Sequence, residues 1–205
     1  MAIDPATDRR LRQLTGALTA EYDGMFSPET VEGVVADSLA RLGQVVVTVH
    51  LPVLTERFAR QRLRAVAQTA GLLAKPHPVV LFVCAHNAGR SQMAAALTRH
   101  ISERRVEALS AGADPASAIN ATVRAALAEL GIELAFEFPK PLTDEVVRAA
   151  DVVVTMGCGE ACPVVPGPRY LNWPIADPAG RSLSVVRGIR QDIANHVLDL
   201  LKELL

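Results

Sequence analysis

The sequence lacks a dominant charge of either sign, and this absence limits the partners that it can attract. Its 205 residues include 21 lysines and arginines and 22 aspartates and glutamates, for a formal net charge of −1. A chain without a basic excess has no general attraction to nucleic acid or to an anionic membrane. It also has no apolar run near the roughly 20 residues of a spanning helix, and no secretion signal at its start. We therefore expect a cytoplasmic protein with neither nucleic-acid nor membrane partners.

Cysteine is also scarce, and its odd number argues against a framework of structural disulfides. The cysteines are Cys84, Cys158 and Cys162. Pairing would leave one of them over, and small secreted scaffolds contain many more. In a cytoplasmic chain of this length, three cysteines indicate catalysis or redox chemistry.

Residues 1–75 predict a small domain of three helices. Apolar residues recur at helical spacing in two stretches, and Ser27 followed by Pro28 fits the start of the second helix. A third helix is expected to begin near Pro52. The β-branched run at residues 45–49 could instead form a short strand, which the pattern leaves open.

The pattern changes after Pro76 and Pro78, a pair that predicts a domain boundary. Residues 79–83 form a continuous apolar run, typical of a strand buried on both faces of a parallel sheet. Helical and strand patterns then alternate, which predicts an α/β fold for residues 78–205 with a doubly wound, four-stranded parallel sheet. Further strands are expected at residues 106–111, 151–156 and 170–173, and helices at 91–103 and 119–130 and in a closing segment from Val186 to Leu204.

The segment from Cys84 to Ser91 joins the first strand of this domain to its first helix. Open α/β sheets bind ligands at this edge, where loop N–H groups and the helix dipole attract an anion. This field favours the thiolate of Cys84 as a nucleophile, and the forked side chain of Arg90 can hold two oxygens of a tetrahedral oxyanion. The alternative, a buried cysteine without a role, is less consistent with this context. The residues expected around the oxyanion are Ala85, His86, Asn87, Ala88, Gly89, Arg90 and Ser91.

The Cys-x5-Arg-Ser motif of residues 84–91 resembles the signature of low-molecular-weight protein tyrosine phosphatases and their arsenate-reductase relatives. The likeness covers residues 78–205, and includes Ser110-Ala111-Gly112 after the second expected strand and the pair Asp177-Pro178. It implies that Asp177 protonates the oxygen that departs when the thiolate attacks, a contribution of about 10²–10⁴-fold. Without the cysteine loop, an Asp-Pro pair would indicate only a turn.

The same loop suits phosphate and arsenate, so the choice between hydrolysis and reduction depends on Cys158 and Cys162. A phosphatase needs one cysteine, because water hydrolyses its phosphocysteine, whereas arsenate reduction needs two electrons from thiols. The segment around the pair resembles the thioredoxin-coupled branch of arsenate reductases, and Ala179 follows the Asp-Pro pair where phosphatases usually have tyrosine. The resemblance implies detoxifying reduction of arsenate to arsenite through an intramolecular disulfide relay, with phosphate or sulfate competing and thioredoxin as reductant.

Other functions remain open at this point. The chain could be a low-molecular-weight protein tyrosine phosphatase with inert extra thiols, a reductase coupled to a small thiol such as mycothiol, or a binding module that holds phosphate without turnover. Zinc on Cys158 and Cys162 is disfavoured, because a structural site needs four ligands and no nearby histidine completes one. We expect no metal and no other cofactor.

The helical region before residue 75 resembles a three-helix extension of some actinobacterial-type arsenate reductases. Four arginines crowd its third helix and permit a nucleic-acid interpretation. Such a run is more often a solvated face, and no aromatic residues interleave with it to stack on single-stranded bases. We favour docking or dimerisation, so a homodimer is expected. The arginines are Arg57, Arg60, Arg62 and Arg64.

Overall fold

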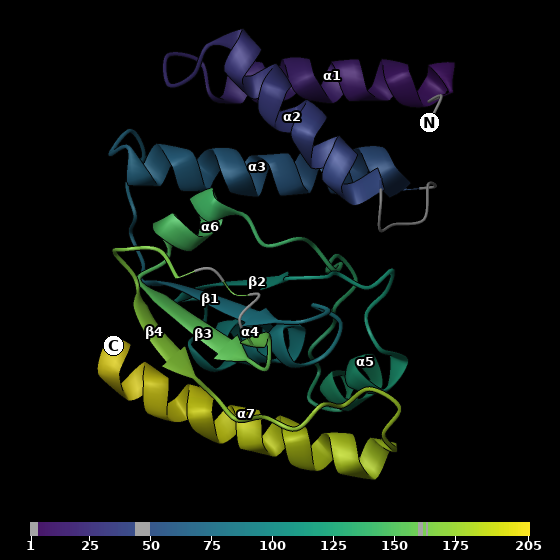
Figure 1. Ribbon diagram of the computed structural model, residues 1–205, viewed down its shortest axis with the longest axis vertical. Helices are drawn as coiled ribbons and strands as arrows, with labels where there is room; N and C mark the ends of the chain where they lie inside the picture. The colour runs from purple at the N-terminus through teal and green to yellow at the C-terminus, as the bar shows by residue number, and fades with distance from the viewer. Residues whose placement is uncertain (1–3, 44–49, 160–161, 163) are drawn as a thin grey trace. The chain divides into compact units, whose positions relative to one another are not determined.

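The computed structural model of the protein describes residues 4–43, 50–159, 162 and 164–205 (Figure 1). These residues form two compact units that divide between Ala74 and Lys75. No helix in the described ranges is long and apolar enough to cross a membrane. Residues 45–49, where the sequence left a strand open, lie outside the described residues.

The first unit consists of helices α1 (Pro5–Glu21), α2 (Pro28–Gly43) and α3 (Leu51–Thr69). Helix α1 begins at a side-chain cap, because the Asp4 carboxylate accepts hydrogen bonds from two backbone N–H groups of the first turn, at 3.0 and 3.1 Å. The apolar stripes of the sequence face inward from the three helices, as amphipathic helices require. They meet in a core of Leu18, Tyr22, Val31, Val35, Ala59 and Leu63.

A buried arginine connects two of these helices. The side chain of Arg62 on α3 is largely enclosed, and its Nη1 donates to Ser38 Oγ at 2.9 Å and lies 2.7 Å from Asp37 Oδ2, both on α2. Arg60 bonds across the unit to the Glu21 carboxylate, with Nε 3.0 Å from Oε2. Two arginines of the expected solvated run therefore join helices to one another, so that expectation was wrong for Arg62.

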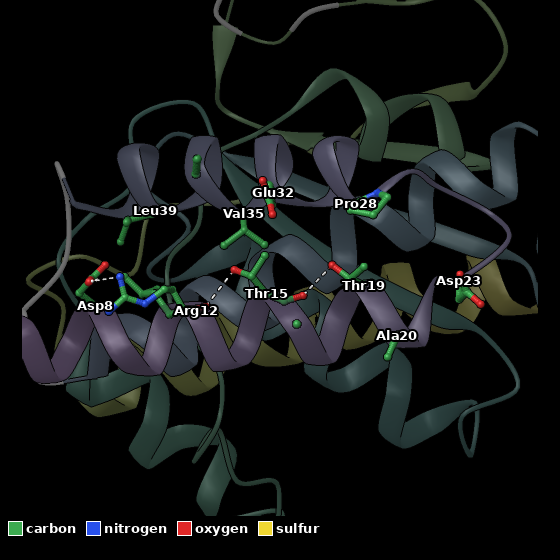
Figure 2. Close-up of a pocket in the computed structure, with 13 residues that line it drawn as sticks. Asp8, Arg12, Thr15, Thr19, Ala20, Asp23, Pro28, Glu32, Val35 and Leu39 are labelled. Atoms are coloured by element: carbon green, nitrogen blue, oxygen red, sulfur yellow. Dashed lines mark hydrogen bonds and ion pairs between the residues drawn. The ribbon is translucent and has the colours of Figure 1, made fainter.

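An open groove of about 880 Å³ runs between α1 and α2, as Figure 2 shows. The hydroxyls of Thr15 and Thr19 donate to backbone carbonyls one turn earlier in α1, each at 2.9 Å. Because both hydroxyls are occupied within the helix, they add little hydrogen-bonding capacity to the groove wall. The small and apolar residues of the groove are Leu11, Gly16, Ala20, Pro28, Val35, Ala36 and Leu39.

The second unit contains a four-stranded sheet of β1 (Val79–Cys84), β2 (Glu107–Gly112), β3 (Val152–Met156) and β4 (Arg169–Asn172). The spatial order is β2-β1-β3-β4, and every pairing is parallel. All six residues of β1 are buried, which explains its unbroken apolar sequence. The predicted α/β fold, with a four-stranded parallel sheet preceded by a helical region, is confirmed.

Helices cover both faces of the sheet (Figure 1). Helix α4 (Arg90–Ile101) packs against β1, β2 and α7 (Leu183–Leu204), and α5 (Ala121–Ala128) packs against α7. Helix α6 (Asp144–Ala149) lies on the opposite face from α7 (Figure 1). The sequence pattern did not predict α6, because six residues are too few to reveal a helical period. The predicted buried stripe of α7 is present, with Val186, Ile189, Ile193, Val197 and Leu200.

The strand register places three strand ends in one row. Cys84 at the end of β1 pairs with Gly112 of β2 on one side and with Met156 of β3 on the other. Adjacent strands of a sheet lie about 4.8 Å apart. The segments that follow β1, β2 and β3 therefore leave the sheet side by side, at the edge where open α/β sheets bind ligands.

Candidate active site

Cys84 lies at the junction of β1 and the loop that leads into α4. Its side chain is 2% exposed, and its Sγ lies 3.0 Å from the Oγ of Ser91 in the first turn of α4. The first N–H groups of a helix have no partners within the helix, and its dipole places a partial positive charge there. The nucleophile predicted from the sequence therefore lies beside a helix N-terminus that favours anions.

Asn87 orients the Ser91 hydroxyl that contacts Cys84. Its φ of 46° lies in the left-handed region, which asparagine tolerates. Its Oδ1 accepts from Gln92 Nε2 and from the backbone N–H of Lys140, both at 3.0 Å, so its Nδ2 faces Ser91 and donates to Oγ at 2.8 Å. Because the Ser91 oxygen accepts this bond, its own proton is free to point to Cys84 and stabilise a thiolate.

The backbone of the loop is anchored to the segment that follows β2. Four loop carbonyls accept hydrogen bonds from N–H groups of residues 113–120, at 2.8 to 3.2 Å. Because the N–H of a trans peptide points away from its C=O, this anchoring turns loop N–H groups toward the centre of the loop, where an anion would bind. The carbonyls belong to Cys84, Ala85, His86 and Ala88.

Gly112 explains the Ser-Ala-Gly run that the sequence singled out. A Cβ at this position would lie 2.8 Å from the carbonyl oxygen of Ala85 and 2.9 Å from the Cβ of Asn87. Only glycine allows β2 to approach the loop this closely. The run forms the last three residues of β2, whereas we expected it after the strand.

Arg90 and Asp177 come together although 87 positions separate them. The Nη2 of Arg90 lies 2.9 Å from Asp177 Oδ2, and its Nη1 donates to the carbonyl of Ile175 at 3.5 Å. The other oxygen of Asp177 accepts the N–H of Ala179 at 3.0 Å, which closes the turn around Pro178. The arginine and the acid predicted from the sequence therefore face the same place.

A pocket of about 90 Å³ opens at this place and is bordered by Cys84, Arg90 and Asp177. One water occupies about 30 Å³ of liquid water, so the volume suits a compact oxyanion of a few heavy atoms. The remaining lining comes from His86, Ala88, Gly89, Ala116, Asn120 and Ala179. The larger groove between α1 and α2 contains no cysteine and does not border this chemistry.

Cys158 and Cys162 lie in the segment that follows β3. They form a disulfide, with Cα atoms 5.8 Å apart, and Cys84 is a free thiol. Cys158 comes two residues after Met156, the partner of Cys84 in the sheet. Its side chain is 9% exposed, and that of Cys162 is more accessible. The disulfide pair therefore lies in the segment that leaves the sheet next to the strand that ends at Cys84.

Sequence reasoning missed the residues that support the loop from behind. Gln92 donates to Asn87 and also to the carbonyl of Phe138 at 2.9 Å, and Lys140 is almost fully buried. Gln92 directly follows the Arg-Ser pair, and its polar side chain at a buried helix position was the available signal. His86, which was expected around the oxyanion, has its Nδ1 3.0 Å from the carbonyl oxygen of Asp114. No group of three or more metal-ligating side chains occurs within the described part of the chain.

Two family models match the chain. The model of the low molecular weight phosphotyrosine protein phosphatase matches residues 79–205. A model of the N-terminal domain of protein-tyrosine-phosphatase-like proteins matches residues 11–67. Together the two matches span both structural units.

Named relatives agree with these matches. The thioredoxin-dependent arsenate reductase of Corynebacterium glutamicum is 42% identical, covers 96% of each chain and superposes with a TM-score of 0.87. A glutaredoxin arsenate reductase of Synechocystis is 30% identical over 128 residues, which is 61% of this chain and 97% of that protein. An arginine phosphatase of Geobacillus stearothermophilus is 29% identical, covers 62% of this chain and 92% of its own, and has a TM-score of 0.54.

Proposed function

Because the chain belongs to the low molecular weight phosphotyrosine protein phosphatase family, among its arsenate reductases, we propose that it reduces arsenate to arsenite for arsenic detoxification. Cys84 acts as nucleophile, Arg90 and the loop N–H groups hold the oxyanion, and Asp177 is the general acid. Cys158 and Cys162 supply the electrons. The observation that carries the proposal is the disulfide of the β3 segment, which leaves the sheet beside Cys84.

The first step forms a bond between Cys84 and arsenic. The Cys84 thiolate attacks arsenic(V), and one oxygen departs as water with the proton that Asp177 donates. The helix N-terminus and Arg90 stabilise the negative charge on the remaining oxygens. Phosphate and sulfate have the same tetrahedral shape and compete for these contacts.

The second step reduces arsenic. The Cys158 thiolate attacks the sulfur of Cys84, and a Cys84–Cys158 disulfide forms as the sulfur–arsenic bond breaks. The electron pair of that bond stays with arsenic, which leaves as arsenite, while the two sulfurs are oxidised. Cys162 then attacks Cys158 and releases the Cys84 thiolate. The Cys158–Cys162 disulfide in the structure corresponds to this final state.

We propose thioredoxin as the reductant of the final disulfide, in the cytoplasm. The greater exposure of Cys162 supports attack by a protein dithiol, and the relative from Corynebacterium glutamicum is described as thioredoxin-dependent. Reduction by a small thiol such as mycothiol is the competing proposal. The arginine phosphatase relative indicates that the same fold can host hydrolysis, so hydrolysis of an aryl phosphate is measured alongside.

Single-turnover experiments test the relay. The variant Cys162→Ser should release about one arsenite per protein and stop with Cys84 bonded to Cys158, which peptide mass spectrometry detects. The variant Cys158→Ser should release little arsenite unless a small thiol is added. A Cys162→Ser protein that cycles with thioredoxin at the parent rate would exclude the three-cysteine relay and favour the small-thiol mechanism.

We further propose that the first unit pairs two copies of the chain along the groove between α1 and α2. One stripe of α1 carries the exposed Arg12 and Gly16 and the half-buried Thr19, and it leads to the exposed Asp23 just beyond the helix. In an antiparallel pair of α1 helices centred between Gly16 and Thr19, Arg12 of each copy faces Asp23 of the other. Figure 2 shows Arg12 and Asp23 toward opposite ends of the groove, with the threonines between them.

The pairing is tested with a substitution that the isolated unit tolerates. No atom lies within 4 Å of a Cβ built at Gly16, so Gly16→Leu should fold while it blocks close approach of a second helix. Light scattering should then give the mass of one chain. Reversing one charge with Arg12→Asp should weaken the dimer, and adding Asp23→Arg should restore it. An unchanged mass in all three variants would exclude this surface.

A further inference from the structure

Gly157 links the redox-active segment to the oxyanion-binding arginine. It lies between Met156, the last residue of β3, and Cys158. Its φ is 72°, and a Cβ built on it would lie 2.6 Å from Nη1 of Arg90. Real Cβ atoms do not approach other atoms this closely, so the guanidinium occupies space that only glycine leaves open.

The Arg90 guanidinium is also held on its other sides. Its side chain is 11% exposed, Nη2 pairs with Asp177 at 2.9 Å, and Nη1 donates to the Ile175 carbonyl at 3.5 Å. A methyl group at position 157 would meet the end of a side chain, and the guanidinium would yield before the backbone did. Such a shift would move the donors that are meant to hold two oxygens of the substrate.

We propose that Gly157 is a positioning residue for Arg90, which sets oxyanion affinity from within the segment that carries the redox cysteines. The inference rests on the proposed role of Arg90 in oxyanion binding. Gly157→Ala should therefore weaken oxyanion binding and raise KM for arsenate more than it lowers kcat.

Gly159 provides a matched control on the same segment. Its φ is 55°, also in the left-handed region, but no atom lies within 4 Å of a Cβ built there. Gly157→Ala and Gly159→Ala therefore share the backbone strain of a left-handed alanine. Only the substitution at position 157 meets Arg90. A third variant, Gly157→Asn, lowers the strain because asparagine tolerates this conformation, but it keeps the offending Cβ.

The experiment is an NMR titration of the full chain, in its Cys158–Cys162 disulfide form, with inorganic phosphate. We expect Gly157→Ala and Gly157→Asn to weaken phosphate binding at least 10-fold, and Gly159→Ala to change it less than twofold. In an Arg90→Lys background, Gly157→Ala should cost less than twofold, because residues that act through one another are not additive. Equal losses at the two glycines, or a loss at position 157 that persists in the Arg90→Lys background, would overturn the proposal.

The titration separates this inference from the proposed reaction. Phosphate binding needs no electron transfer, so a parent protein that fails to reduce arsenate but shows the expected pattern keeps the positioning role and loses the reductase function. If the parent protein reduces arsenate but Gly157→Ala and Gly159→Ala bind phosphate equally well, only the positioning role is excluded. Far-ultraviolet circular dichroism of each variant, compared with the parent, verifies that the fold is intact.

Discussion

The two units of the chain use buried polar groups for different purposes. In the helical unit, Arg62 reaches from α3 to Asp37 and Ser38 on α2 and holds two helices together. In the sheet unit, Asn87 and Ser91 are enclosed around Cys84 and hold a strained loop in one conformation. Substitutions in the first network should therefore lower stability, and substitutions in the second should lower turnover.

The largest expected effect is the loss of the nucleophile. Serine does not ionise near neutral pH, so Cys84→Ser should reduce arsenate turnover by several orders of magnitude. The thermal midpoint of unfolding should stay within a few degrees of the parent value, because the two side chains are similar in size. Arsenite production and circular dichroism on one sample measure both. Retained turnover would remove Cys84 from the mechanism.

A smaller loss of activity is expected when the positive charge of Arg90 is kept but its planar guanidinium is replaced. Lysine offers a point charge in place of a planar fork, so Arg90→Lys should lower kcat/KM for arsenate on the order of 100-fold. The midpoint of denaturant unfolding should change little, since lysine keeps the charge beside Asp177, whose side chain is 49% exposed. Parent-like activity would mean that Arg90 does not hold the oxyanion.

In the helical unit we expect a substitution to lower stability and leave arsenate turnover unchanged. Arg62→Met leaves the buried hydroxyl of Ser38 without this donor and removes a partner of Asp37, so it should destabilise the unit by about 1–3 kcal/mol. Arsenate turnover per folded molecule should be unchanged. Arg60→Met is the matched control, because its more exposed pairs should contribute less than about 1 kcal/mol. Equal losses in urea unfolding would contradict the special role of Arg62.

The smallest effect concerns acid stability. Partial burial raises the pKa of Asp37, but hydrogen bonds from Arg41 and Arg62 outweigh it and bring the pKa below the usual 3.8. A lowered pKa in the folded state adds stability above the unfolded pKa and loses it as the pH falls through the folded pKa. Asp37→Asn should therefore lower stability at pH 7 and flatten its decline below about pH 4. Urea unfolding between pH 7 and pH 2.5 measures this slope.

How far the sequence predicted the molecule depended on the distance between interacting residues. The strand, loop and helix around Cys84 follow from contiguous residues, so the α/β fold and the nucleophile loop could be predicted locally. The bond from Lys140 to Asn87 spans 53 positions and the pair of Arg62 and Ser38 spans 24, and no local pattern encodes such contacts. Asp177, which the structure places beside Arg90, was singled out in the sequence only because the motif resemblance pointed to it.

The role proposed for Gly157 also could not be predicted from the sequence. A glycine near two cysteines suggests backbone freedom, and its sequence neighbours do not reveal that Arg90 occupies the space beside it. Gly159, two residues later, has the same type of backbone and empty space. Identical residues in one segment therefore have different roles, and only the three-dimensional contacts distinguish them.

The exposure of the three sulfurs has a consequence for damage by oxidants. Cys84 is 2% exposed, Cys158 is 9% exposed and Cys162 is the most accessible, so accessibility rises in the order in which the proposed relay passes oxidation outward. Peroxide converts accessible thiolates to sulfenic and then to irreversible sulfinic acids. Burial of Cys84, the proposed nucleophile, should limit this overoxidation, and Cys158 and Cys162 can be oxidised instead to a reversible disulfide. We therefore expect the enzyme to be inactivated slowly by peroxide.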